Sequence, residues 1–306
     1  MAHVLNASMP RSGHHFLEIV LRNILQDKFN YCEFYGKDCC KTIPCNSRRH
    51  ERSSSGDLFM QKSHDFGFDD PISVAGTYRV VQYRNPVPRS LSNYELHLRN
   101  GAQDNVRIFR NFLVNEAWYF HKFYAKWIEG RLPKFFILAY EDFTADPVKA
   151  LLTFLRHVKL PIDPNRVSEG IAQSVTVSRR GRERIPFVPS DVSSHRYAKH
   201  PVLANFQEIV IRNCRGYFPM RYFPSDDPDN SLIGIMFRAK KAIDAADREL
   251  AIALAEAAYA QDPDDPALEK LCRSARSIPA RPIYADLHCR GVQPESGTRP
   301  HLEQSR

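Results

Sequence analysis

The first twenty residues combine a short apolar strand, a tight turn and an amphipathic helix. Residues 3–8 have the pattern of a buried strand, and a turn containing Pro10 and Gly13 follows directly. The next segment repeats its apolar residues at helical spacing, at Leu17, Val20, Leu21, Ile24 and Leu25. A strand, loop and helix N-terminus in this order present backbone N–H groups and a positive dipole to an anion. Arg11 and Ser12 add a guanidinium and a hydroxyl, so the turn predicts a phosphate-like or sulfate-like ligand.

The rest of the first 224 residues alternates between strand and helix patterns. The predicted strands cover 3–8, 57–62, 77–83 and 134–140, and the predicted helices cover 14–27, 87–99, 105–129, 146–158 and 202–214. This alternation is typical of a three-layer α/β fold, in which helices flank a mostly parallel sheet. Residues 36–56 and 175–200 are expected to be loops, and the second loop is long enough to be a lid.

The composition changes near residue 225. An Ala-rich helical segment is predicted over 231–261 and a short helix over 267–276, which resembles one helix-turn-helix unit of a tetratricopeptide-type array. One such unit cannot bury its own apolar face, so we expect it to pack on the core or on a partner. The partner could be a second copy of this chain, which would make a homo-oligomer through residues 231–276. The predicted division is an α/β domain over 1–224, an accessory helical hairpin over 225–278 and an extended or disordered tail over 279–306.

The charge of the chain is concentrated in its first part. The first 224 residues hold 32 Lys and Arg against 21 Asp and Glu, whereas the whole chain has a net charge of +8. This excess favours an anionic ligand. The chain has no apolar run of the ~20 residues that a membrane span needs. The N-terminus also lacks the charged and apolar regions of a signal peptide, so a cytoplasmic protein is expected.

Four of the seven cysteines lie within fourteen residues, at Cys32, Cys39, Cys40 and Cys45. Their spacing lacks the paired CxxC pattern of standard zinc sites. Free thiols in a reducing cytosol, a local disulfide and a metal clip in a loop all remain open.

Two further polar segments follow predicted strands. Arg84 comes directly after the strand over 77–83, and Ser92 lies eight residues later in a helix, so both could converge on one phosphate. Lys62 ends the predicted strand over 57–62, and His64 lies two residues further on. A neutral histidine is a suitable base near pH 7, and a lysine can neutralise charge on a leaving oxygen.

Two segments later in the chain carry weaker signals. Arg179, Arg180 and Gly181 lie in the predicted lid, where clustered arginines and a glycine could approach a phosphate. Tyr140 ends the last predicted strand and could reach a nucleotide. The Walker pattern G-x-x-x-x-G-K-[ST] is absent from the sequence, which disfavours ATP hydrolysis.

Taken in order, these segments resemble the sulfotransferase family that uses 3′-phosphoadenosine 5′-phosphosulfate (PAPS). The family's phosphosulfate loop, Pro-Lys/Arg-Ser-Gly-Thr-Thr-Trp, is similar to the segment Pro10-Arg11-Ser12-Gly13-His14-His15-Phe16. The other family motifs are similar to Lys62-Ser63-His64, Arg84 with Ser92, Tyr140-Glu141-Asp142 and Arg179-Arg180-Gly181. The resemblance covers about residues 1–224 and implies a P-loop-like sulfotransferase core.

The resemblance also implies roles for these residues. His64 would be the base, with Lys62 and Arg11 neutralising charge during transfer to an acceptor hydroxyl. Cofactor contacts would come from Arg11, Ser12, Gly13, His14, His15, Phe16, Arg84, Ser92, Tyr140, Arg179, Arg180 and Gly181. No metal is implied. Arg11 is more similar to the carbohydrate-directed members, which hints at a glycan acceptor, with lipid or small-molecule acceptors also open. Nucleic acid is not an expected partner.

The chain departs from the family pattern at three positions of the loop. His14 and His15 replace two threonines, and Phe16 replaces a tryptophan expected to stack on adenine. Two alternatives stand beside the sulfotransferase prediction. One is a non-catalytic protein that binds anionic nucleotides or glycans, and the other is a P-loop kinase-like phosphotransferase.

Overall fold

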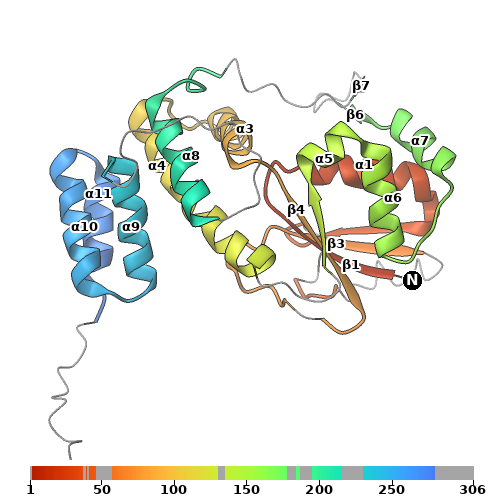
Figure 1. Ribbon diagram of the computed structural model, residues 1–306, viewed down its shortest axis with the longest axis horizontal. Helices are drawn as coiled ribbons and strands as arrows, with labels where there is room; N and C mark the ends of the chain where they lie inside the picture. Colours follow the sequence, from red (N-terminus) through yellow and green to blue (C-terminus); the bar gives the residue numbers. More distant parts are fainter. Residues whose placement is uncertain are drawn as a thin grey trace, which may run out of the picture.

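The computed structural model describes residues 2–36, 39, 41–45, 57–72, 74–129, 135–177, 184–186, 195–214 and 230–279. Its centre is a parallel five-stranded sheet with the strand order β2-β3-β1-β4-β5 (Figure 1). The strands are β1 (Ala2–Ser8), β2 (Phe29–Glu33), β3 (Leu58–Ser63), β4 (Thr77–Tyr83) and β5 (Phe135–Ala139). The predicted three-layer α/β fold with a parallel sheet is confirmed.

Both faces of the sheet are buried because neighbouring residues of each central strand enter different cores. In β1, Val4 joins one core and Leu5 the other, and Val80 and Val81 divide in the same way in β4. The first core is covered by α1 (His14–Leu25), α6 (Pro147–His157) and α7 (Pro164–Ala172). The second core is covered by α3 (Pro86–Arg99), α4 (Val106–Tyr124) and α8 (Pro201–Asn213).

Several elements differ from the sequence-based expectation. The strand β2 and the helices α5 (Tyr140–Ala145) and α7 were not predicted. A short antiparallel pair, β6 (Val175–Val177) and β7 (Arg184–Pro186), lies inside the predicted lid loop. The helix predicted over 105–129 ends at Tyr124 and continues as the π-helical turn η2 (Ala125–Glu129). β2 is short, with only two buried residues, and pairing with β3 along its full length makes it a strand.

Within residues 230–279 the structure describes three helices: α9 (Leu232–Asp244), α10 (Arg248–Gln261) and α11 (Pro266–Arg276). The helix predicted over 231–261 is broken at Ala246, whose φ is +54°, and the side chain of Asp247 then caps α10. Met236 and Leu254 share a hydrophobic core with Leu5 of the central sheet. These helices therefore extend the core of the α/β region. The boundary predicted at residue 224 stays a prediction, because residues 215–229 lie outside the described ranges.

No helix within the described ranges has both the length and the apolar character needed to cross a bilayer.

Candidate functional site

The predicted site residues gather at the carboxyl ends of the central strands. β1 lies between β3 and β4 and is parallel to both, so the segments that follow these strands emerge at one edge of the sheet. Open α/β sheets bind ligands at this edge, where the strand order reverses. The predicted residues here are Arg11 to Phe16 after β1, Lys62 and His64 at β3, Arg84 after β4, Ser92 in α3 and Tyr140 after β5. Arg179, Arg180 and Gly181 lie outside the described residues.

The loop after β1 is held in place by polar side chains of the sheet. Gln82 of β4 donates from Nε2 to the carbonyl oxygen of Ser12 at 2.9 Å, and Asn6 of β1 donates to Gln82 Oε1 at 3.1 Å. Gly13 has a φ of +85°, and a Cβ at this position would lie 2.8 Å from Cδ2 of Tyr140. Only glycine therefore fits both the backbone conformation and the space.

The N-terminus of α1 faces this edge without a side-chain cap. The first N–H groups of a helix have no partner within the helix, so they are available to an anion. Two buried polar atoms beside them, Ser12 Oγ and His14 Nδ1, have no hydrogen-bond partner among the described residues. Unpaired buried polar atoms are rare in folded proteins. Both atoms could therefore contact an anion bound at this helix end.

The two histidines of the loop lie in different environments. His14 is buried, and burial, followed by the positive charge of Lys62, holds its pKa far below the usual range. His14 is therefore a neutral imidazole that can donate one ring N–H. His15 is exposed, and its Nδ1 lies 3.7 Å from a carboxylate oxygen of Glu18. His14 thus faces the site, while His15 lies at its outer rim.

Two arginines connect the loop with the segments after β4 and β5. Arg11 donates from Nε to Ser92 Oγ in α3 at 3.0 Å. The guanidinium of Arg84 lies 4.3 Å from the ring centroid of Tyr140, the same ring that packs against Gly13. The loop after β1 and the segment after β4, which are predicted to bind the two anionic groups, are therefore adjacent. Arg11 and Ser92 join them directly, and Tyr140 contacts both.

Lys62 lies between a carboxylate and an imidazole. Its Nζ is 2.7 Å from Glu33 Oε1 and 2.6 Å from His64 Nε2, and its side chain is fully buried. Burial lowers the pKa of Lys62, and the Glu33 carboxylate opposes this shift. Burial also acts to raise the pKa of Glu33, but the hydrogen bond and charge of Lys62 outweigh it and lower that pKa.

The hydrogen bonds of His64 determine its tautomer. His64 Nδ1 lies 2.5 Å from the carbonyl oxygen of Ser8, which can only accept, so Nδ1 carries the hydrogen. Nε2 is then the acceptor that faces Lys62. Burial, followed by the charge of Lys62, lowers the pKa of His64 to about 3. The ring is therefore neutral near pH 7, with its basic nitrogen directed toward the ammonium group.

A buried aspartate fixes the backbone next to His64. Asp65 Oδ2 accepts hydrogen bonds from Lys126 Nζ at 2.6 Å and from Trp127 Nε1 at 2.7 Å, both in η2. Tyr119 of α4 donates from its hydroxyl to the carbonyl oxygen of His64 at 2.5 Å. π-Helical turns are frequent at functional sites, and here the turn holds the segment that carries the candidate base.

Two exposed aromatic rings flank His64. The ring of Tyr35 stacks on the imidazole with a centroid distance of 5.9 Å and an interplanar angle of 15°. The ring of Phe66 lies 5.1 Å from the imidazole and 5.3 Å from Tyr35. Their exposures of 42% and 54% are among the highest of the large hydrophobic residues described. Together they form an apolar rim beside the candidate base.

The predicted role of Phe16 does not fit its position. Phe16 is 6% exposed and packs in the hydrophobic core 5.0 Å from the ring of Phe143. Its apolar position on the core-facing side of α1 explains this burial, and little of the ring remains to stack on a base.

Sequence reasoning also missed three residues that support the site. Glu33 was missed because β2 was not predicted. Gln82 and Asp65 carried a detectable signal, because Gln82 is a polar residue within the buried strand β4 and Asp65 lies two residues after the buried strand β3.

Three solved structures are similar to this chain, and two of them are named as sulfotransferases. Mouse sulfotransferase SULT7A1 complexed with PAP is 14% identical, with a TM-score of 0.46, over 89% of this chain and 88% of that one. Retinol dehydratase in complex with androsterone and inactive cofactor PAP is 14% identical, with a TM-score of 0.48, over 72% and 82%. The sulfotransferase domain of the Synechococcus PCC 7002 olefin synthase is 13% identical, with a TM-score of 0.38, over 73% and 90%. No protein-family model and no curated protein matches the sequence.

Proposed function

We propose that this chain is a sulfotransferase that moves a sulfuryl group from PAPS to an acceptor hydroxyl. The observation that carries the proposal is the position of His64, a neutral imidazole whose ring lies 5.1 Å from His14 of the anion-binding loop. The loop after β1 and the candidate base thus lie side by side, and the Nε2 lone pair of that base accepts a hydrogen bond from Lys62. The ammonium group of Lys62 adjoins both.

The residues present suit the two anionic groups of PAPS. Ser12 Oγ, the His14 ring and the N-terminus of α1 would hold the 5′-phosphosulfate, because they are buried donors at the end of a helix. Arg84 and Ser92 would hold the 3′-phosphate, and the hydrogen bond from Arg11 to Ser92 joins this group to the loop after β1. Arg179, Arg180 and Gly181 remain predicted members of this second group.

PAPS supplies an activated sulfuryl group: the acceptor oxygen would form the new O–S bond as the S–O bond to the 5′-phosphate breaks, and 3′,5′-adenosine bisphosphate would leave with the electron pair of that bond. Nε2 of His64 takes the proton of the acceptor hydroxyl, since Nδ1 is committed to the Ser8 carbonyl. Lys62 moves from Nε2 toward the charge that develops on oxygen, while its bond to Glu33 keeps it nearby. Arg11 provides the second positive charge. Most of the rate enhancement then comes from positioning and charge stabilisation, as in phosphoryl transfer.

The acceptor side of the proposal follows from the rim beside His64. Tyr35 and Phe66 present exposed ring faces, which suit an acceptor with a flat apolar face next to its hydroxyl. A sugar ring has such a face, in line with the hint of a glycan acceptor that Arg11 gives, and so does a phenol. A panel of labelled glycans, phenols and lipid head groups separates these classes.

Nucleotide binding is tested by thermal shift. We expect 3′,5′-adenosine bisphosphate (PAP) to raise the melting temperature well above the rise caused by 5′-AMP, because Arg84 and Ser92 bind the additional phosphate. Arg84→Ala is expected to reduce the difference between the two nucleotides. Equal shifts with both nucleotides in the unmodified protein would contradict the assignment.

Catalysis is tested by transfer of labelled sulfate from PAPS to the acceptor panel. We expect His64→Asn to lower kcat by about 10²–10⁴-fold, the usual contribution of a general base, and to leave the PAP-induced thermal shift intact. His97→Asn is the matched control, because His97 is exposed on α3 and outside the site. Undiminished transfer by His64→Asn removes this residue from the role of base.

A further inference from the structure

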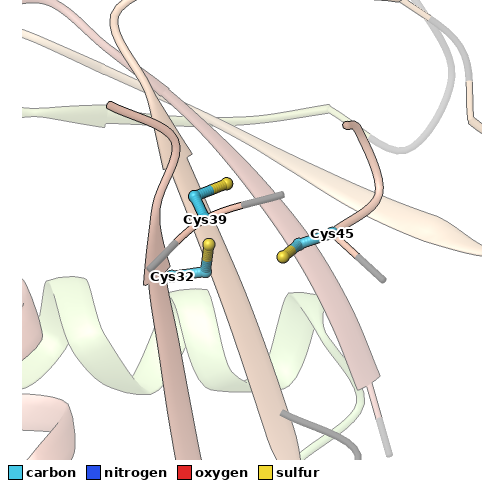
Figure 2. A group of neighbouring side chains, drawn as sticks. All are labelled: Cys32, Cys39 and Cys45. Carbon is cyan, nitrogen blue, oxygen red and sulfur yellow. The ribbon is translucent and has the colours of Figure 1, made fainter. Parts of the chain in front are cut away.

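We propose that Cys32, Cys39 and Cys45 bind one zinc ion as thiolates (Figure 2). Cys32 lies in β2, and the other two cysteines lie in the loop that follows it. The proposal concerns a structural site separate from the sulfuryl-transfer site and does not depend on the proposed activity.

The geometry of the three sulfurs is that of a metal site. All three Sγ atoms lie within 4.8 Å of one another. Thiolates bound to one tetrahedral zinc, with Zn–S bonds of about 2.3 Å, lie roughly 3.8 Å apart. The three cysteines are only 3–8% exposed, and Figure 2 shows their side chains converging on a common space. Small side-chain movements therefore bring all three sulfurs onto one ion.

The loop is held around the sulfurs by specific hydrogen bonds. The backbone N–H of Cys45 donates to Gln61 Oε1 at 2.8 Å, and Gln61 Nε2 donates to the carbonyl oxygen of Thr42 at 2.7 Å. Gln61 is buried in β3, so it fixes this part of the loop to the sheet. The N–H of Lys41 donates to Cys39 Sγ at 3.4 Å. Outer hydrogen bonds of this kind orient metal ligands and support their charge.

The hydrophobic cluster around these cysteines contains few residues. Apart from the cysteines, the cluster contains Phe59 and the partly buried Phe34. The described parts of residues 34–45 contain neither helix nor strand. Two aromatic side chains bury little area relative to the entropy of ordering such a loop, and small cores of this type are usually stapled by a metal or a disulfide.

A metal accounts for three convergent thiols better than a disulfide does. A disulfide joins two of them and leaves a third buried thiol beside the bond, whereas three thiolates form one face of a tetrahedral zinc site. Thiolates are soft ligands and favour zinc over magnesium or calcium. Cys40 lies outside the described residues and is not part of the proposed ligand set.

The site also borders the catalytic region along the chain. Glu33, which holds Lys62, directly follows Cys32, and Tyr35 lies two residues further on. Zinc binding would therefore stabilise β2 and the start of the loop, because the ion fixes both ends of the segment.

The test measures metal content in the full chain, purified under reducing conditions without chelator. We expect one zinc per chain by elemental mass spectrometry, and loss of most of it in Cys32→Ser, Cys39→Ser and Cys45→Ser. Cys272→Ser is the matched control, since Cys272 is also a buried free cysteine but lies in α11, away from the cluster. This control is expected to retain its zinc.

A second measurement avoids dependence on the folding of the variants. The unmodified protein is stripped with a chelator and titrated with Zn²⁺ or Co²⁺. Zinc is expected to raise its melting temperature, and cobalt is expected to give the near-ultraviolet charge-transfer band of Co²⁺–thiolate bonds. The proposal is overturned if the purified protein contains no zinc and gains neither signal. It is also overturned if protein purified in parallel without reductant holds a disulfide between two of the three cysteines, identified by peptide mapping before and after reduction.

Discussion

At the scale of single residues, the chemistry of the candidate site depends on burial more than on residue type. His64 in water would be partly protonated near its ordinary pKa of 6.5, but burial and the charge of Lys62 lower that pKa to about 3. His14 is shifted in the same direction, with burial again the largest cause. Two neutral imidazoles therefore lie at the candidate site, and the charge of Lys62 contributes to lowering the pKa of each.

This shift predicts a loss of stability in acid. Between pH 6.5 and about 3, the unfolded chain binds a proton at His64 and the folded chain does not, so the free energy of unfolding falls as the pH falls through this window. We expect His64→Asn to make the dependence shallower between pH 4 and 6, measured by urea unfolding at a series of pH values. The exposed His97→Asn variant should keep the original slope. An unchanged slope in His64→Asn would show that His64 is not buried as a neutral ring.

The turn glycine of the anion-binding loop gives a second prediction. Gly13→Ala and Gly101→Ala both place a Cβ on a residue with positive φ, which costs about 1–2 kcal/mol. Gly101 has open space around it, whereas the new Cβ at Gly13 would lie 2.8 Å from Tyr140. We therefore expect Gly13→Ala to destabilise the protein more than Gly101→Ala in urea unfolding, and to be the only one that weakens the PAP-induced thermal shift. Equal destabilisation would show that Tyr140 moves aside easily.

At the scale of elements, α3 and α4 are joined by a buried charge pair. Arg89 of α3 is fully buried, and its Nη1 donates to Glu116 Oε2 of α4. Asn93 donates to the other Glu116 oxygen at 3.1 Å, and Ser90 donates to the first at 3.3 Å. α3 also carries Ser92, the partner of Arg11. This pair therefore positions the helix that closes one side of the site.

Removal of one charge from this pair should lower the free energy of unfolding strongly. Glu116→Gln leaves the Arg89 guanidinium buried without a counter-charge, and breaking a buried pair in this way typically costs about 3–5 kcal/mol. Glu95→Gln, at the solvent-facing pair with Arg99, is the control and should cost less than about 0.5 kcal/mol. Equilibrium urea unfolding measures both. Similar small losses in the two variants would mean that water reaches the Arg89 side chain.

At the scale of the whole molecule, the C-terminal helices share the core of the sheet domain. Asp265, only 1% exposed, accepts hydrogen bonds from Arg110 and Asn111 of α4 and also caps α11 through the N–H of Ala267. Asp262 accepts from Arg107 at 2.8 Å. Polar contacts thus surround the apolar contact between α9 and α4.

Because the C-terminal helices share one hydrophobic core with the sheet, we expect the protein to unfold in one cooperative transition. Tryptophan fluorescence, which reports on Trp118 and Trp127, should change at the same urea concentration as far-ultraviolet circular dichroism. Asp265→Ala should move both curves together to lower urea, with a loss of about 3 kcal/mol for a broken buried pair. Two separate transitions would instead mean that the C-terminal helices unfold on their own, as the predicted accessory domain implies.

The sequence by itself determined the central strands, the loop between β1 and α1, and the order of the polar segments. These features depend on local rules: apolar runs form buried strands, Pro and Gly mark the turn, and polar residues that follow parallel strands meet at one edge of the sheet. Arg11, Lys62, His64, Arg84 and Ser92 could therefore be placed together from the sequence.

The tertiary structure alone decided how these residues act. The tautomer of His64 depends on Ser8, 56 positions away, and the state of Lys62 depends on Glu33 in a strand that the sequence pattern did not reveal. Asp65 reaches Trp127 across 62 positions, Phe16 is turned into the core, and three cysteines converge beside β2. Such contacts join segments that are distant in sequence, and the packing of the whole fold, rather than any local pattern, brings them within bonding distance.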